Sequence, residues 1–233
     1  MIMKLISCLG TLAALTVAHS ARADFMFTVN AAIPEGNPVG MTSGGTVSGL
    51  ADGSTIASLS VGLNISGGYN GDLYGYLVAP GGNSVVLLNQ PGATPDDPFG
   101  YGGSGYNITL VDAATLSLQN TPEVDGVPMV GTFQPAGQLS SLNGINGNGT
   151  WTLYIADLGL GGGEAVLDDW SLDIATVVAP EPGQIAGMLV LMAGSAGYWA
   201  IRRQRRVLKD LKEARDQKDI KKTGNLNREI FGG

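Results

Sequence analysis

The feature that most constrains this 233-residue chain is the distribution of its charges. No Lys, Arg, His or Cys occurs between Asp24 and Pro182, although that stretch contains fifteen carboxylates. All thirteen basic residues lie outside it, two of them before Asp24 and eleven after Ile201. A fold built from this stretch must therefore place its carboxylates without basic side chains of its own to neutralise them.

The missing residue types exclude most enzymatic chemistry. Without His or Lys the stretch has no conventional base for a Ser nucleophile, and without Cys it has no thiol nucleophile. Zinc would lack its usual N and S ligands, disulfides cannot form, and no Lys or Arg is present to bind the phosphates of a nucleic acid. Two carboxylates could act as a glycosidase acid and base, but nothing identifies a particular pair. We therefore expect a protein without enzymatic activity and without a nucleic-acid partner.

Residues 1–23 have the organisation of a secretory signal peptide. Lys4 supplies a positive start, residues 5–18 are apolar, and Ala21 and Ala23 form a small-x-small cleavage site for signal peptidase. This order predicts export, with the mature chain beginning at Asp24.

The C-terminal region has three parts in a fixed order. A Pro-Glu-Pro motif comes first, a seventeen-residue uncharged stretch at residues 185–201 follows, and an Arg cluster comes next. The motif and cluster residues are Pro180, Glu181, Pro182, Arg202, Arg203, Arg205 and Arg206. Seventeen residues is the short end of a membrane span, so we expect a transmembrane helix at about 185–201 with the arginines on the cytoplasmic side. A buried core helix is the alternative.

Together these parts, at residues 179–206, resemble the PEP-CTERM sorting signal of Gram-negative bacteria. The resemblance implies recognition by an exosortase, a membrane transpeptidase, and cleavage near the Pro-Glu-Pro motif. It also implies an inner-membrane intermediate with the body in the periplasm, then delivery to the cell surface or an extracellular exopolysaccharide matrix. The chain continues beyond the arginines as a charged tail, residues 207–233, which we expect to be cytoplasmic. Its charges have helical spacing, although a plain polar tail is the alternative.

The body, residues 24–178, has the sequence pattern of an all-β sandwich. Short apolar stretches are separated by clusters of Gly, Asn, Asp and Pro. Apolar residues alternate with polar ones at 59–65, 151–156 and 170–174, as in strands with one buried face. Residues 73–79 and 84–89 flank a Pro-Gly-Gly-Asn turn, which predicts a hairpin. We expect eight or more strands, with the longest loop at roughly 90–106.

Several segments in order over residues 33–175 resemble the P domain, or Homo B domain, of subtilisin-like proprotein convertases. They are Ile33–Asn37, Ser60–Ile65, Gly71–Leu73, Leu77–Gly81, Gly131–Pro135, Leu139–Gly144, Gly149–Asp157 and Leu167–Leu172. The resemblance implies a jelly-roll β-sandwich of the galactose-binding-like type. In convertases this domain follows a serine protease domain, whose peptidase activity does not transfer to the P domain itself.

Calcium is the cofactor that we expect. Unpaired carboxylates repel one another on folding, and Ca²⁺ binds six to eight oxygens from carboxylates, carbonyls and water. The resemblance also implies calcium, and the candidate ligands are Asp72, Asp112 and Asp157. For each aspartate the alternative role is to cap a turn, and the alternative for the carboxylates as a set is a solvated acidic surface.

The leading functional hypothesis is an exported, calcium-stabilised protein with a structural or adhesive role at the surface or in the matrix. One alternative is a calcium-dependent polysaccharide-binding module, for which Tyr101 and Tyr106 are candidate sugar-stacking residues; the alternative for both is an ordinary loop aromatic. The other is an accessory P domain for a separate subtilisin-like serine protease. Trp151 and Trp170 lie in strand patterns and are expected in the core.

Overall fold

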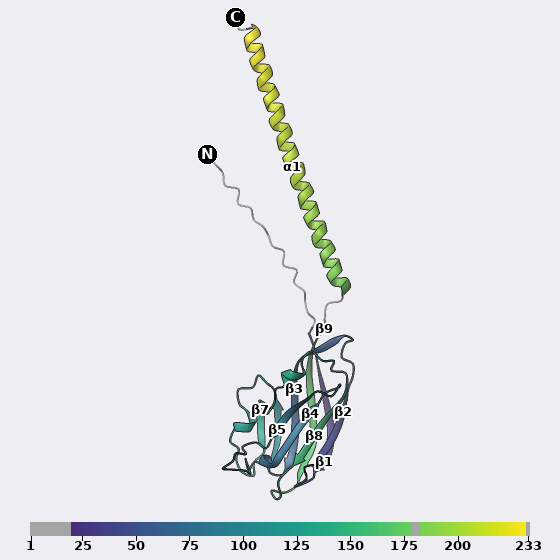
Figure 1. Ribbon diagram of the computed structural model, residues 1–233, viewed down its shortest axis with the longest axis vertical. Coiled ribbons are helices and arrows are strands. Elements are labelled where there is room, and N and C mark those ends of the chain that lie inside the picture. The colour runs from purple at the N-terminus through teal and green to yellow at the C-terminus, as the bar shows by residue number, and fades with distance from the viewer. Residues whose placement is uncertain (1–19, 179–181, 232–233) are drawn as a thin grey trace. The chain divides into compact units, whose positions relative to one another are not determined.

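The computed structural model describes residues 20–178 and 182–231, with the side chains of residues 20–178 and 190–221. Residues 20–178 form nine strands and three short 3-10 helices, and a long helix follows (Figure 1). The strands are β1 (Ser20–Ile33), β2 (Met41–Val47), β3 (Ser54–Gly67), β4 (Leu73–Val78), β5 (Ser84–Asn89), β6 (Gly105–Leu110), β7 (Met129–Phe133), β8 (Gly149–Asp157) and β9 (Ala165–Val178). The helices are η1 (Asn70–Asp72), η2 (Leu118–Asn120), η3 (Leu139–Leu142) and α1 (Pro182–Phe231). The predicted sandwich is thus confirmed as an all-β body.

The strands form two sheets. The five-stranded sheet has the order β1-β9-β3-β6-β7, and the four-stranded sheet has the order β2-β8-β4-β5. All pairings are antiparallel except that of β6 with β7, which is parallel. Strand β9 is central to the larger sheet because it pairs along its length with both β1 and β3.

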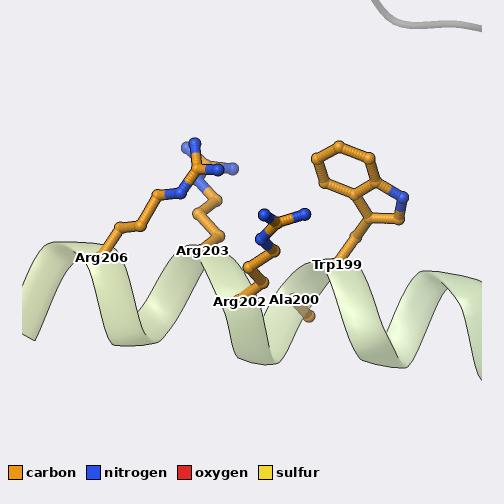
Figure 2. Close-up of a pocket in the computed structure, with 5 residues that line it drawn as sticks. All are labelled: Trp199, Ala200, Arg202, Arg203 and Arg206. Atoms are coloured by element: carbon orange, nitrogen blue, oxygen red, sulfur yellow. The ribbon is translucent and has the colours of Figure 1, made fainter.

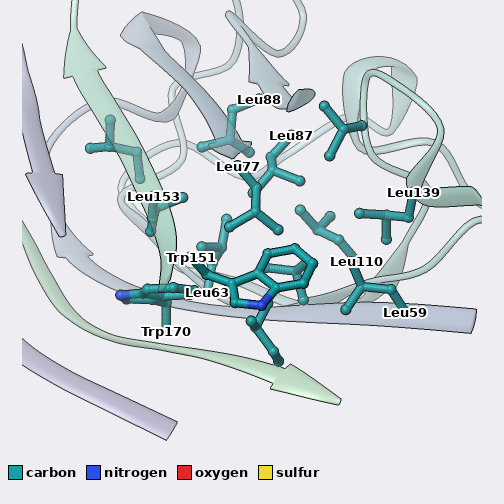
Figure 3. Packing of buried hydrophobic residues seen from close by; sticks show 14 of the residues in the cluster. Leu59, Leu63, Leu77, Leu87, Leu88, Leu110, Leu139, Trp151, Leu153 and Trp170 are labelled. Carbon is teal, nitrogen blue, oxygen red and sulfur yellow. The ribbon is translucent and has the colours of Figure 1, made fainter. Parts of the chain in front are cut away.

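The inward faces of the two sheets form one hydrophobic core. Trp151 of β8 and Trp170 of β9 are fully buried in it, as their strand patterns predicted (Figure 3). The indole N–H of Trp170 donates to Ser43 Oγ of β2 at 2.9 Å, which links the larger sheet to the smaller one. The ring of Phe27 packs on Trp170 with centroids 4.4 Å apart. The core therefore joins the sheets both by apolar burial and by a hydrogen bond from its largest side chain.

The alternating segments predicted as strands all lie in strands, namely β3, β8 and β9. The predicted hairpin is β4 and β5, and its turn uses Gly81 and Gly82 at φ of 95° and 92°. Glycine adopts such angles without steric cost, and the Ala79 N–H closes the turn on the Asn83 carbonyl at 2.8 Å. The turn chemistry thus sets the register of the two strands.

Strand β1 begins within the predicted signal peptide, the rest of which (residues 1–19) lies outside the described residues. Ala21 and Ala23, the predicted cleavage residues, pair with Thr176 and Ile174 of β9. Between them, Arg22 forms an ion pair with Asp173. Cleavage at the predicted site would remove the first four residues of β1 and this ion pair.

Helix α1 requires a correction to the sequence prediction. No helix in the described parts of the chain is long and apolar enough to cross a membrane, which contradicts the transmembrane helix predicted at residues 185–201. The uncharged stretch is seventeen residues long, which is short of the ~20 residues that a span needs. The helix then continues through the charged tail, where Lys209 and Glu213 pair at 3.7 Å. Pro180 and Glu181 of the predicted sorting motif lie outside the described residues.

We predict that Trp151→Ala lowers the free energy of unfolding by about 3–5 kcal/mol, the range for truncating a fully buried aromatic side chain. The variant also loses the hydrogen bond that the indole N–H donates to the Gly147 carbonyl at 2.9 Å. Urea denaturation followed by tryptophan fluorescence and circular dichroism measures the change. Val124→Ala, at a position that is 69% exposed, is the control and should change stability by less than about 0.5 kcal/mol. Equal midpoints for the two variants would show that Trp151 is not part of the core.

Candidate functional site

The negative charges of three carboxylates, Glu35, Asp72 and Asp157, interact near the ends of β1 and β8. We call these three residues the carboxylate cluster. Asp157 is the last residue of β8 and lies opposite Leu73 of β4. Asp72 ends η1, directly before β4, and its carbonyl accepts the Leu158 N–H at 2.9 Å. Sheet pairing therefore brings together two aspartates that are far apart in the sequence.

Asp157 is the most confined of these side chains. The residue is 0% exposed, and its Oδ1 accepts the Gly159 N–H at 3.1 Å. Its Oδ2 is buried and has no hydrogen-bond partner. A buried oxygen of this kind loses hydration without compensation, which is unfavourable by about 1–3 kcal/mol and more when the group is charged.

The loop after β8 contacts the other two carboxylates. A Cβ on Gly159 would lie 2.2 Å from the carboxylate of Asp72, so only glycine allows Asp72 to lie against the backbone there. Glu35 Oε1 accepts the Gly161 N–H at 2.5 Å. Backbone amides of a single glycine-rich loop thus bind Glu35 and Asp157, while its first glycine makes room for Asp72.

The acid–base properties of the cluster reflect its confinement. The pKa of Asp157 is raised to about 6, mainly by burial; the Gly159 N–H opposes this shift, and the negative charges of Asp72 and Glu35 add to it. Burial also raises the pKa of Asp72, with a further contribution from the charge of Glu35. The cluster therefore favours a positive charge, either protons or a metal cation.

The side chains alone do not complete a metal site. Among the described residues, no group of three or more His, Cys, Asp or Glu side chains is arranged to hold a metal ion. A cation at the cluster would take further oxygens from backbone carbonyls and water, which calcium accepts readily. The unpartnered Asp157 oxygen is the feature of the cluster that fits such an ion.

Of the three predicted ligands, the structure brings Asp72 and Asp157 together and places Asp112 elsewhere. Asp112 accepts the N–H groups of Leu139 and Ser140, both at 2.8 Å, and so caps η3 as its alternative role predicted. Glu35 was not predicted as a ligand. It lies far from Asp157 in the sequence, and only tertiary folding reveals that the two charges interact.

The two tyrosines considered as candidate sugar-stacking residues are differently placed. Tyr106 is 0% exposed, so it cannot stack on a sugar. Its hydroxyl donates to Glu123 Oε1 at 3.3 Å, and Asn70 Nδ2 donates to Glu123 Oε2 at 2.7 Å. These bonds join three loop and strand segments in the interior. Tyr101 is partly exposed and packs beside Gly92.

The arginines of the predicted sorting signal lie along one helix. Figure 2 shows Trp199, Ala200, Arg202, Arg203 and Arg206 along neighbouring turns of α1, where they line a shallow hollow. The five residues that line it, among those that the structure describes, all belong to α1. They form a basic helical surface with an exposed indole.

Comparison with known proteins identifies the type of β-sandwich. The family model described as the proprotein convertase P-domain matches residues 56–174. No curated protein sequence matches the chain. Among solved structures, the serine protease of Aeromonas sobria in complex with its chaperone is 15% identical, with a TM-score of 0.44 over 69% of this chain and 28% of the protease chain. A second structure, of a serine protease of Aeromonas sobria, is 16% identical, with a TM-score of 0.43 over 67% of this chain and 27% of that chain. The chain thus spans less than a third of these proteases.

We predict that metal-free protein loses stability as the pH rises from about 4 to about 6. The folded-state pKa of Asp157, about 6, lies above its ordinary value of 3.8, so the folded state binds the proton more tightly than the unfolded state in this window. Urea midpoints across the window measure the slope, which Asp157→Asn should reduce. Asp112→Asn, which alters a carboxylate outside the cluster, should keep it. A wild-type midpoint that rises over the same window would contradict the assigned environment of Asp157.

Proposed function

Because this chain belongs to the proprotein convertase P-domain family, we propose that it is an exported, non-enzymatic β-sandwich protein that Ca²⁺ stabilises at the carboxylate cluster. Its role is structural or adhesive, at the cell surface or in an extracellular matrix. The observation that carries the proposal is the buried Asp157 oxygen without a hydrogen-bond partner, in a body, residues 24–178, that has no basic side chains.

The residue types of the family-matched region support a non-enzymatic role. Residues 56–174 contain no His, Cys, Lys or Arg. The region therefore lacks the bases and thiols on which nucleophilic catalysis depends. Its most confined carboxylate, Asp157, is 0% exposed, whereas a catalytic acid or base must reach a substrate.

The calcium proposal rests on the chemistry of the cluster. Asp157 and Asp72 would provide carboxylate oxygens, and Glu35 would contribute charge nearby. Burial, with a further contribution from neighbouring negative charges, raises the pKa values of both aspartates. Calcium prefers hard oxygen ligands, and its two positive charges would offset this cost of holding carboxylates together in a buried place. Bound to the folded state only, the ion would stabilise the sandwich by mass action.

We predict that adding Ca²⁺ to about 5 mM stabilises chelator-treated protein by roughly 2 kcal/mol, since extracellular calcium modules bind with Kd values near 10⁻⁴ M. Thermal melts with Ca²⁺ or with EGTA measure the shift, which should be several degrees. Asp72→Asn and Asp157→Asn should each reduce it strongly.

Asp112→Asn is the matched control for this experiment, because Asp112 lies against backbone amides outside the cluster. It should keep the calcium shift of the parent protein. A parent melting temperature that is the same in millimolar Ca²⁺ and in EGTA would refute calcium stabilisation. A shift that survives both cluster variants would place the ion elsewhere.

Export and sorting complete the proposal. We propose that signal peptidase removes residues 1–23 and that an exosortase recognises the Pro180-Glu181-Pro182 motif and the arginines that follow Ile201. The support is the order of the sequence motifs and their likeness to the PEP-CTERM signal. By this route the body would pass through the periplasm and reach the surface or matrix, where exopolysaccharide is a potential partner.

We predict that replacing Pro180, Glu181 and Pro182 by alanine leaves the protein unprocessed and cell-associated, because the exosortase would lose its recognition motif. Immunoblots of cell and culture fractions from the producing bacterium measure processing and release. Pro95→Ala with Pro98→Ala alters an exposed Pro-Asp-Asp-Pro segment of the sandwich and should leave processing unchanged. Normal release of the triple-alanine variant would exclude this sorting route.

A further inference from the structure

The outer face of the four-stranded sheet differs from the rest of this acidic body because it carries no charge. Strands β2, β4, β5 and β8 contain a single charged residue, Asp157, which is buried. The exposed and partly exposed positions of these strands are occupied by tyrosines, by threonines such as Thr42, Thr46 and Thr152, and by small polar or aliphatic residues. We call this surface the tyrosine face.

The outer face of the five-stranded sheet, in contrast, carries charged side chains. Its outer face bears Asp168, Asp169 and Asp173 of β9, all partly exposed. Asp169 accepts a hydrogen bond from Asn64 at 2.8 Å, and Asp168 accepts one from Ser66 at 3.3 Å. Asp173 pairs with Arg22, but Asp168 and Asp169 show that an outer sheet face of this body can carry carboxylates beside neutral donors. Solubility alone does not require that the tyrosine face be uncharged.

Three tyrosines form the centre of the face. Tyr76 of β4 lies directly opposite Tyr154 of β8, and their rings stack with centroids 4.6 Å apart. Tyr74 packs edge-on against both rings, with centroids 6.2 Å from Tyr76 and 6.4 Å from Tyr154. The hydroxyl of Tyr154 donates to the Pro38 carbonyl at 2.5 Å. Contacts within the folded protein thus orient the rings in advance, which lowers the entropic cost of binding a ligand there.

Cross-strand pairing accounts for part of this arrangement. An aromatic pair across two strands stabilises a sheet by about 0.2–1 kcal/mol, and Tyr76 with Tyr154 is such a pair. Pairing does not explain why all four strands lack exposed charge. A surface of partly exposed aromatic rings surrounded by hydroxyl groups has the composition of a binding site for a ligand that is apolar on one side and hydroxylated on the other.

We propose that the tyrosine face binds a neutral polysaccharide. The C–H faces of sugar rings pack on aromatic rings, and sugar hydroxyls exchange hydrogen bonds with Tyr and Thr hydroxyls. Anionic glycans are disfavoured because no Lys, Arg or His lies in residues 24–178 to pair with them, whereas carboxylates are numerous. The rings lie on the outer face of the sheet, whereas Asp72 and Asp157 of the carboxylate cluster are buried, and the glycan proposal does not depend on the calcium proposal.

Native affinity electrophoresis of the full chain tests the proposal. Gels would contain laminarin, hydroxyethylcellulose or dextran as neutral polysaccharides, or alginate as an anionic one. At least one neutral polysaccharide should retard the protein and alginate should not. Tyr76→Ala and Tyr74→Ala should each weaken the retardation at least about tenfold, while Tyr76→Phe, which keeps the stacked ring, should weaken it less. Thermal melts would confirm that each variant is folded.

Tyr101→Ala is the matched control, because Tyr101 is a partly exposed tyrosine outside the four strands and should leave retardation unchanged. No retardation by any neutral polysaccharide would overturn the proposal, as would stronger retardation by alginate. Loss of binding only in Tyr101→Ala would show that the glycan binds at the loop that contains Tyr101 and not at the tyrosine face. A concentration-dependent dimer that Tyr76→Ala dissociates would identify the face as a protein interface instead. The gels are repeated with EGTA. Retardation that persists in EGTA shows that glycan binding does not require calcium, so the two proposals can fail independently.

Discussion

The structure depends on one electrostatic constraint, which is that the carboxylates of the β-sandwich have almost no cationic partners within it. Neutral donors take that role. Asn70 donates to Glu123 at 2.7 Å, Asn64 donates to Asp169 at 2.8 Å, and backbone amides of η3 bind both oxygens of Asp112. Arg22, paired with Asp173, is the exception in the described body. A neutral donor stabilises an ionised carboxylate less than a cationic partner does. A carboxylate without a cationic partner is therefore favoured only where amides or water can donate hydrogen bonds to it.

This constraint accounts for the asymmetry of the sandwich. The core between the sheets is apolar and is joined across the sheets by the Trp170–Ser43 hydrogen bond, so the carboxylates are confined to loops, strand ends and one outer face. The larger sheet bears exposed aspartates beside Asn and Ser donors, whereas the smaller sheet bears hydroxyls and tyrosines. Asp157 is the last residue of β8, where a buried strand meets a loop, and one of its carboxylate oxygens has no hydrogen-bond partner. The two proposed sites follow from the same asymmetry: a cation where charge is confined, and a neutral ligand where charge is absent.

Much of the fold could be predicted from the sequence because strands with one buried face repeat with a period of two. The alternation in β3, β8 and β9 and the turn chemistry of the β4–β5 hairpin are local properties, and each was predicted correctly. The parallel pairing of β7 with β6 was not predicted, because pairing between distant segments leaves no local pattern. The transmembrane prediction failed for a related reason, since a short apolar stretch is compatible with more than one environment.

The sequence by itself determined the chemistry that this body can and cannot perform. A region without His, Cys, Lys or Arg cannot acquire their chemistry by folding, and its alternating pattern already specified a β-sandwich. Only the tertiary structure decided which residues meet. It placed Glu35 beside Asp72 and Asp157, made Asp112 a cap for η3, buried Tyr106, and gathered Tyr74, Tyr76 and Tyr154 on one uncharged face. The physical reason is that composition is fixed residue by residue, whereas proximity depends on strand order and register, which arise from contacts between segments far apart in the chain.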